Sequence, residues 1–302
     1  MGTAALVSDG LSKSYGKTVG VADVSLRVEH GELLGFLGPN GAGKTTFIRL
    51  ALGLLRPSSG SIEVMGHDIA QARMSALSEI GYLPGELSLF DSLTGARTLT
   101  LLGRLHPRPP VLQHELLDLL ELGSRDLERP VRQYSRGMKQ KLGLVSALQH
   151  DPAVAILDEP TGGLDPVTQL RLLDWLAARS ARGRTVFFSS HVLAEVERVC
   201  HRVAMIRDGR LIVVATVDEL RRERMRSVEV IFSEPIEGDS YAVPGIGPVE
   251  VDGLVHRFSL QGEPGPLLAR LAELPVKDLA IERTRLEDIF RDYYIPREEA
   301  PA

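Results

Sequence analysis

The chain has 302 residues, long enough for one large domain with an appendage, and 43% of them are hydrophobic, enough for a sizeable core. A net charge of −5 argues against a broad nucleic-acid-binding surface, and a single cysteine excludes an intrachain disulfide. The N-terminus lacks the pattern of a signal peptide, and no apolar run approaches the ~18 residues that span a bilayer. We therefore expect a protein that is soluble by itself and reaches a membrane only through a partner.

Charge is distributed unevenly along the chain. Residues 227–302 contain seven Lys/Arg and fifteen Asp/Glu, a balance of −8, which leaves +3 for the preceding part. This change of composition predicts two domains, residues 1–222 and residues 223–302. Helical periodicity within residues 86–150, between strand-like segments, predicts a helical insert in an α/β body.

Two strand-like segments begin the chain, residues 5–13 and 23–28, and the second alternates apolar residues as a strand with one buried face does. The loop between them contains Tyr15. Its ring, upstream of a phosphate-binding loop, could stack on a nucleotide base. A surface tyrosine without a function is the alternative.

A phosphate-binding loop follows the next apolar segment, where two glycines are separated by four residues and followed by Lys-Thr. The glycines let backbone N–H groups surround an anion, and the helix that follows adds the positive end of its dipole. Lys44 can reach the β- and γ-phosphates of a nucleotide, and the Thr45 hydroxyl can hold Mg²⁺. The predicted nucleotide-binding residues of the loop are Gly38, Pro39, Asn40, Gly41, Ala42, Gly43, Lys44, Thr45 and Thr46.

Another helix is predicted from about residue 135 to residue 149. Ser135 stands where an N-cap belongs, and capping alone would explain it. The same helix start, where Gly137 allows close backbone approach, could also present N–H groups to a phosphate. This segment alone leaves both interpretations open.

Two further buried strands are predicted to carry polar residues at their carboxyl ends. Residues 153–157 are apolar and run into Asp158 and Glu159, and residues 185–190 run into His191. Ligands of open α/β sheets bind at such ends, so we expect Asp158 to serve Mg²⁺ and Glu159 to polarise an attacking water. An acidic pair that merely ends a strand in solvent is the alternative.

The C-terminal segment predicts a small α+β domain. Residues 227–233 and 249–260 are strand-like, and the second of these folds into a hairpin at Asp-Gly. An amphipathic helix at residues 264–274, a short strand and a last helix at residues 285–294 complete it.

Taken together, these motifs resemble the ATP-binding subunit of ABC transporters over residues 6–220. The resemblance implies an α/β fold, with a P-loop NTPase core of ABC type, an antiparallel N-terminal β subdomain and the helical insert. It implies ATP and Mg²⁺ as cofactors, with Tyr15 stacking on adenine and Thr45 and Asp158 holding the metal. Glu159 would be the catalytic base and His191 the switch histidine.

The resemblance also implies a dimer, in which a signature sequence contacts the ATP of the partner chain. The signature residues would be Ser135, Arg136, Gly137 and Met138, and the dimer-contact loop would contain Asp165. A homodimer and a heterodimer with a similar ATPase are both compatible with the sequence.

The signature Tyr-Ser-Arg-Gly-Met-Lys-Gln-Lys-Leu and the late Leu-Glu-Asp-Ile-Phe are similar to the subgroup that powers ABC-2 type exporters. The expected function is ATP hydrolysis that powers export through a separate membrane permease, at the cytoplasmic face of the membrane. No nucleic acid is expected as a partner. The alternatives are a soluble ABC-type ATPase acting on translation or DNA, and a non-transport regulatory ATPase.

The chain departs from the family pattern twice. Tyr134, Arg136 and Met138 replace three members of the usual Leu-Ser-Gly-Gly-Gln signature. The family also expects Gln after Gly-Tyr-Leu-Pro, where this chain has Gly85. One Mg²⁺ ligand is therefore in doubt, and either water or Glu86 would replace it.

We expect the permease to dock on the helical insert and on residues 82–94. Five apolar residues lie close together in that segment, and an exposed apolar patch usually marks an interface. They are Leu83, Leu87, Leu89, Phe90 and Leu93. The alternative is that they cover the insert's own core.

Overall fold

The computed structural model describes residues 4–222 and 225–283, and the chain divides into two compact units, residues 1–215 and 216–302. This division precedes the domain boundary predicted after residue 222. The last predicted helix, residues 285–294, lies outside the described residues.

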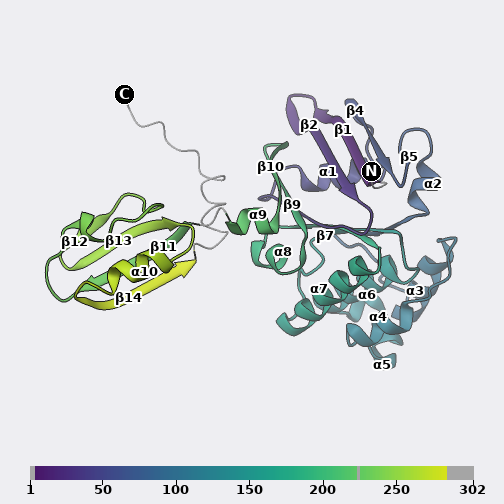
Figure 1. The fold of residues 1–302 in the computed structure, drawn as a ribbon. Helices are drawn as coiled ribbons and strands as arrows, with labels where there is room; N and C mark the ends of the chain where they lie inside the picture. Colours follow the sequence, from purple (N-terminus) through teal and green to yellow (C-terminus); the bar gives the residue numbers. More distant parts are fainter. Residues whose placement is uncertain (1–3, 223–224, 284–302) are drawn as a thin grey trace. The chain divides into compact units, whose positions relative to one another are not determined.

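An antiparallel sheet of four strands opens the first unit, in the order β2-β1-β4-β5 (Figure 1). Its strands are β1 (Ala4–Tyr15), β2 (Thr18–Glu29), β4 (Ser59–Val64) and β5 (His67–Asp68). The predicted alternation in the second strand is confirmed, because Val24, Leu26 and Val28 are all buried.

The second sheet has six strands in the order β10-β9-β3-β8-β7-β6, and β9, β3, β8, β7 and β6 pair in parallel. They are β3 (Leu33–Leu37), β6 (Ile80–Leu83), β7 (Val154–Asp158), β8 (Thr185–Ser190), β9 (Arg202–Arg207) and β10 (Arg210–Thr216). Every residue of β3, β7 and β8 is buried, as in parallel strands covered on both faces. Leu37 pairs with Ser190 and Asp158 with Ser189, so the carboxyl ends of these three strands meet at one edge.

Helices cover the sheets and form the predicted insert, α3 to α6, which lies on one side of the unit, away from β1, β2 and β4 (Figure 1). The helices of the insert are α3 (Gly95–Arg104), α4 (Gln113–Leu119), α5 (Ser124–Leu127), a 3₁₀ turn (Val131–Gln133) and α6 (Arg136–Leu148). The others in this unit are α1 (Lys44–Ala51), α2 (Arg73–Leu77), α7 (Pro166–Ala181) and α8 (Leu193–Val199).

Helix α1, which follows the phosphate-binding loop, is held against the parallel sheet by three aromatic rings. The ring of Phe36 lies 5.1 Å from those of Phe47 and Phe187, centroid to centroid, and the last two are 5.7 Å apart. All three are fully buried, and such packing adds about 0.5–1.5 kcal/mol per pair beyond the burial of area. The start of α1 is therefore fixed at the carboxyl end of β3.

The second unit begins with α9 (Val217–Arg222) and contains a four-stranded antiparallel sheet, in the order β12-β13-β11-β14. Its other elements are β11 (Met225–Phe232), a 3₁₀ turn (Gly238–Tyr241), β12 (Glu250–Asp252), β13 (Val255–Gln261), α10 (Gly265–Leu271) and β14 (Val276–Arg283). Phe232, Tyr241, Phe258 and Leu267 lie in one apolar core of this unit. The predicted hairpin and amphipathic helix are thus both present.

Candidate nucleotide-binding site

The loop between β3 and α1 needs glycine for two physical reasons. Gly41 and Gly43 have φ values of +82° and +109°, in the left-handed region that other residues rarely adopt. A Cβ at Gly43 would also lie 2.4 Å from the carbonyl oxygen of Gly20, and one at Gly38 would lie 2.5 Å from that of Ile206. The loop is therefore packed tightly against its neighbours, with its backbone in the shape that surrounds a phosphate.

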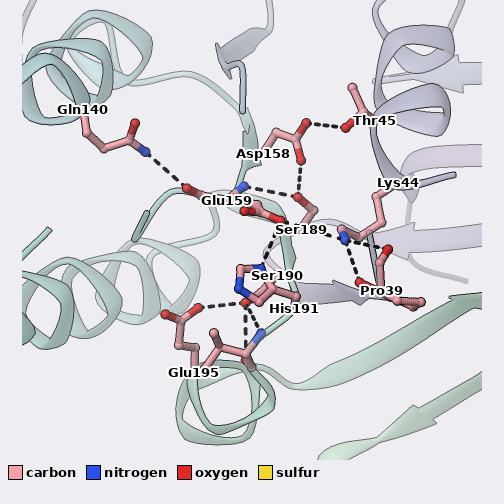
Figure 2. A network of polar contacts seen from close by, with 12 residues as sticks. Pro39, Lys44, Thr45, Gln140, Asp158, Glu159, Ser189, Ser190, His191 and Glu195 are labelled. Atoms are coloured by element: carbon pink, nitrogen blue, oxygen red, sulfur yellow. Dashed lines mark hydrogen bonds and ion pairs between the residues drawn. The ribbon is translucent and has the colours of Figure 1, made fainter. Parts of the chain in front are cut away.

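Lys44, the first residue of α1, turns its ammonium group back into this loop (Figure 2). Its Nζ donates to the carbonyl oxygens of Gly38 at 2.6 Å and Pro39 at 3.2 Å, and lies 3.9 Å from Oε1 of Glu159. Burial lowers the pKa of Lys44, while the carboxylates of Glu159 and Asp158 act in the opposite direction. The amine is thus positioned where a nucleotide phosphate would replace its carbonyl partners.

Asp158 connects the phosphate-binding loop to the parallel sheet. Its Oδ2 accepts a hydrogen bond of 2.9 Å from the Thr45 hydroxyl, and its Oδ1 accepts one from the Ser189 hydroxyl. A hydroxyl and a carboxylate oxygen are ligands that Mg²⁺ accepts, completed by substrate phosphates and water. No cluster of three His, Cys, Asp or Glu side chains suited to a metal occurs within residues 4–222 and 225–283. As ligand types, the Thr45 hydroxyl and the Asp158 carboxylate fit a magnesium ion.

Glu159 leaves the end of β7 with φ of +51°, which is unusual for a residue with a side chain. Its backbone N–H lies 3.2 Å from both the carbonyl oxygen and the hydroxyl of Ser189, and its carbonyl oxygen accepts from the Gln140 side chain at 3.2 Å. These bonds hold the turn on both sides. The carboxylate then meets Nδ1 of His191 at 3.1 Å (Figure 2).

Lys44, Thr45, Asp158 and Glu159 border a cavity of about 480 Å³. Its walls are formed by Tyr15, Thr18, Val19, Gly20, Pro39, Asn40, Gly41, Gly43, Lys44, Thr45, Thr46, Arg49, Tyr82, Pro84, Gly85, Glu86, Asp158 and Glu159. Tyr15 is 45% exposed, and the ammonium group of Lys13 lies 5.5 Å from the centroid of its ring. The predicted residues Gly38, Ala42 and His191 are not part of the cavity wall, and His191 meets the site only through Glu159. The volume suits a small polar ligand, and the loop and carboxylates suit a nucleotide with its metal.

Comparison with known proteins decides the family. The sequence model described as ABC transporter matches residues 21–162. A daunorubicin resistance ATP-binding protein from Streptomyces coeruleorubidus is 34% identical over 303 residues, which cover 96% of each chain. This chain belongs to the ATP-binding proteins of ABC transporters. The predicted family, the α/β P-loop fold and ATP hydrolysis that powers transport are thereby confirmed.

Two further relatives and one solved structure are also described as ATP-binding proteins or subunits. A Nod factor export ATP-binding protein from Paraburkholderia xenovorans is 34% identical, covering 96% of this chain and 97% of its own. An uncharacterized ABC transporter ATP-binding protein from Nostoc sp. is 40% identical over 209 residues, which cover 68% of this chain and 62% of that protein. A solved ATP-binding subunit of an ABC transporter is 32% identical and superposes with a TM-score of 0.67, covering 73% of this chain and 92% of its own. ABC ATP-binding proteins bind ATP, dimerise and work with membrane permease subunits.

Little space is available for a side chain at residue 85, where the family has glutamine. Gly85 and Glu86 both line the nucleotide cavity, and a Cβ at Gly85 would lie 3.1 Å from Oδ2 of Asp158. Any side chain at residue 85 would therefore press on the Asp158 carboxylate. Glu86 is exposed and lines the same cavity.

The ABC signature lies at the start of α6, outside the nucleotide cavity of its own chain. The predicted cap is confirmed, because the Ser135 hydroxyl accepts from the backbone N–H of Met138 at 3.2 Å. A Cβ at Gly137 would lie 2.6 Å from the carbonyl oxygen of Gly163. Asp165 similarly caps α7, because its carboxylate accepts from the Thr168 hydroxyl and from the Thr168 backbone N–H, the latter at 3.0 Å. These two hydrogen bonds lower the pKa of Asp165. Local structure thus accounts for three of these residues, and their role toward a partner's ATP stays a prediction.

The expected apolar patch is only partly exposed. Leu83 is fully buried, so its assignment to an exposed surface is wrong. A Cβ at Gly143 would meet the side chains of Leu83 and Leu87 within 3.0 Å, which places both against α6. Leu89 and Leu93 are half-buried, and Phe90 is 51% exposed.

Several residues around the cavity were not recognised from the sequence. Ser189 holds both Asp158 and the backbone of Glu159, and the buried Gln140 holds the turn after it. The signal for Ser189 was a pair of serines at the carboxyl end of a strand whose middle is apolar. Arg49 and Tyr82 also line the cavity; Tyr82 stands in the Gly-Tyr-Leu-Pro segment, where attention fell on the residue after the proline.

Proposed function

We propose that this chain powers the export of a substrate through a separate membrane permease, with Glu159 as the residue that activates water. The observation that carries the assignment is the position of Oε1 of Glu159, 3.1 Å from Nδ1 of His191 and 3.9 Å from Nζ of Lys44. A general base must lie within hydrogen-bond reach of the water that it activates, beside the phosphate that the water attacks. Of the three carboxylates along the cavity, Asp158 is engaged by Thr45 and Ser189 and Glu86 is exposed, whereas Glu159 lies beside Lys44 at the phosphate-binding loop.

The chain's own groups divide the work of binding and hydrolysis. Tyr15 stacks on adenine, and Lys44 with the loop N–H groups holds the phosphates. Thr45 and Asp158 would hold Mg²⁺, which neutralises charge on the β- and γ-phosphate oxygens. Glu159 accepts the proton of the attacking water, and His191 holds the Glu159 carboxylate in position.

Two copies, or one copy with a similar ATPase, act head to tail. The signature residues Ser135, Arg136, Gly137 and Met138 then face the ATP of the partner chain, and Asp165 lies at the contact between the chains. The position of Ser135 outside its own cavity supports this arrangement, because the N-terminus of a helix of thirteen residues attracts anions.

Export is the direction of transport that the relatives support, since one of them is an export ATP-binding protein and another a drug resistance ATP-binding protein. None of the helices within residues 4–222 and 225–283 has the length and apolar character that crossing a bilayer requires. The chain would therefore reach the cytoplasmic face of the membrane by docking on its permease. Phe90, exposed beside the helical insert, marks the docking surface.

A photo-crosslinking residue in place of Phe90 tests the proposed partner. We expect it to capture a protein with several membrane spans when the full chain is expressed in its source cells. Met74 is 78% exposed but lies on α2, so the same residue at position 74 serves as the control and should not capture that protein. Capture of non-membrane proteins alone from position 90 would contradict the permease assignment.

A further inference from the structure

A second cavity, of about 470 Å³, borders the nucleotide cavity on the other side of Glu159. Three residues line both cavities, namely Gly85, Glu86 and Glu159. The remaining wall of the second cavity is formed by Leu87, Tyr134, Arg136, Lys139, Gln140 and Gly162. The Glu159 carboxylate thus lies between two cavities, and only the first of them is needed for the nucleotide.

The charges of the second cavity are separated in space. The carboxylates of Glu86 and Glu159 lie in the part common to both cavities, whereas Arg136 and Lys139 line only the second. Both cations belong to the first turn or so of α6, where the helix dipole adds a positive potential. An anion beside Glu159 would therefore be repelled from the shared wall and attracted toward α6.

The cations are available for a ligand, while the neutral polar groups are not. The Tyr134 hydroxyl donates to the carbonyl oxygen of Asp126 at 2.6 Å, and the Gln140 amide donates to those of Glu159 and Pro160. Within residues 4–222 and 225–283, the Arg136 guanidinium has no hydrogen bond or ion pair. Lys139 is bound at 2.9 Å only to the exposed Asp91. The neutral polar side chains of the second cavity are thus held by their own hydrogen bonds, and its two cations can bind an anion.

We propose that the second cavity binds the inorganic phosphate produced by ATP hydrolysis and passes it to solvent while ADP still occupies the first cavity. The proposal rests on the hydrolysis assigned above. In that step, water attacks the γ-phosphorus, the bond to the bridging β-phosphate oxygen breaks, and the proton of the water goes to Glu159. The products are ADP and inorganic phosphate, and the latter carries a charge of about −1.5 near pH 7.

Phosphate formed in this way has one favourable direction to leave. Bound ADP fills the nucleotide cavity and repels a second anion through its own β-phosphate, as do Asp158 and Glu159. Arg136 and Lys139 lie beyond Glu159 on the opposite side. The two products therefore leave by separate routes. Phosphate leaves past α6, and ADP leaves past Tyr15.

Two matched substitutions test the role of the Lys139 charge. Lys139→Met removes the cation, whereas Asp91→Asn removes the same ion pair and leaves the cation in place. In single-turnover experiments, rapid quenching measures ATP cleavage, and a fluorescent phosphate-binding sensor measures phosphate release. We expect Lys139→Met to slow release about tenfold with cleavage unchanged, and Asp91→Asn to leave release unchanged or faster. Equal slowing by both variants, or no slowing by Lys139→Met, would overturn the proposal.

An equilibrium measurement separates this proposal from the hydrolytic assignment. Binding of inorganic phosphate to the full chain saturated with ADP requires no hydrolysis and can be followed by calorimetry. We expect Lys139→Met to weaken phosphate binding about tenfold, and Asp91→Asn, which keeps the cation, to leave it unchanged or tighter. Phosphate binding that is the same in wild type and in Lys139→Met would refute the second cavity as the phosphate site, whatever the rate of hydrolysis.

Discussion

The imidazole rings of His106 and His150 stack face to face, with centroids 3.4 Å apart and planes at 25°. His106 follows α3 of the insert, and His150 follows α6 just before β7, so the pair joins the insert to the parallel sheet. Both nitrogens of His150 and Nε2 of His106 are buried and lack a hydrogen bond of standard geometry among the described residues. Nδ1 of His106 accepts from the N–H of Arg108, whose side chain is paired with Glu79.

This stack predicts a loss of stability in acid. Burial, and next the neighbouring His106, lower the pKa of His150 to about 4, and burial also lowers that of His106. Below pH ~6.5 the unfolded chain therefore binds protons that the folded chain does not, and stability falls until about pH 4. His150 alone should cost about 2 kcal/mol between pH 7 and pH 5.

Urea unfolding at the two pH values measures this loss, followed by the fluorescence of the single tryptophan, Trp175, which lies in the first unit. His150→Phe keeps a flat ring in the stack and should remove most of the pH dependence. His114→Phe changes an exposed histidine and should retain it. An unchanged pH dependence in His150→Phe would show that other groups cause the acid loss.

Gly137→Ala should destabilise the fold itself, by about 1–3 kcal/mol, because the new Cβ would lie 2.6 Å from the carbonyl oxygen of Gly163. Thermal unfolding of the isolated protein measures the effect. Gly265→Ala provides the control, since nothing lies within 4 Å of a Cβ there, and it should leave the melting temperature unchanged or slightly raised. If the Gly137→Ala protein is as stable as wild type, the loop that contains Gly163 can shift at little cost to accommodate the new Cβ.

Mixing two inactive chains tests the head-to-tail dimer. Lys44→Ala removes the phosphate-binding amine of one chain, and Ser135→Arg blocks the signature of the other. In a mixed dimer one site keeps both an intact Lys44 and an intact Ser135, so activity should return on mixing. If ATPase activity stays absent at all mixing ratios, either both groups act within one chain or the two sites must both be intact.

Glu86→Ala tests what replaces the missing glutamine. If Glu86 moves toward the metal, its removal should raise the Mg²⁺ concentration for half-maximal hydrolysis. Metal-free ATP binding should stay unchanged or become slightly tighter, because a carboxylate near the γ-phosphate is lost. Ser88→Ala, a change at an exposed neighbour, serves as the control. Superimposable Mg²⁺ titrations of wild type and Glu86→Ala would show that water takes the ligand position.

The sequence was sufficient for the parts of the site that depend on strand order. Lys44, Asp158, Glu159 and His191 come from three different segments, yet parallel strands present their carboxyl ends at one edge, so their meeting follows from topology. The phosphate loop was recognisable because its glycines have left-handed backbones that few other residues adopt.

What the sequence could not show depends on packing between segments far apart in the chain. The buried state of Leu83 depends on α6, where Gly143 leaves space for it, and an apolar residue next to an exposed loop gives no sign of this. The second cavity has the same origin, because Glu86, Arg136 and Glu159 belong to separate loops and helices that only the folded chain brings together.

The most direct test of the account is Glu159→Gln, which keeps the size of the side chain and removes its ability to accept a proton. We expect ATP binding to remain intact while turnover falls by a factor of about 10² to 10⁴. Glu195→Gln changes a carboxylate that bonds the Ser190 hydroxyl at the same edge, and turnover should be nearly normal there. Turnover of the Glu159→Gln protein equal to that of wild type would contradict the assignment of Glu159 as the base.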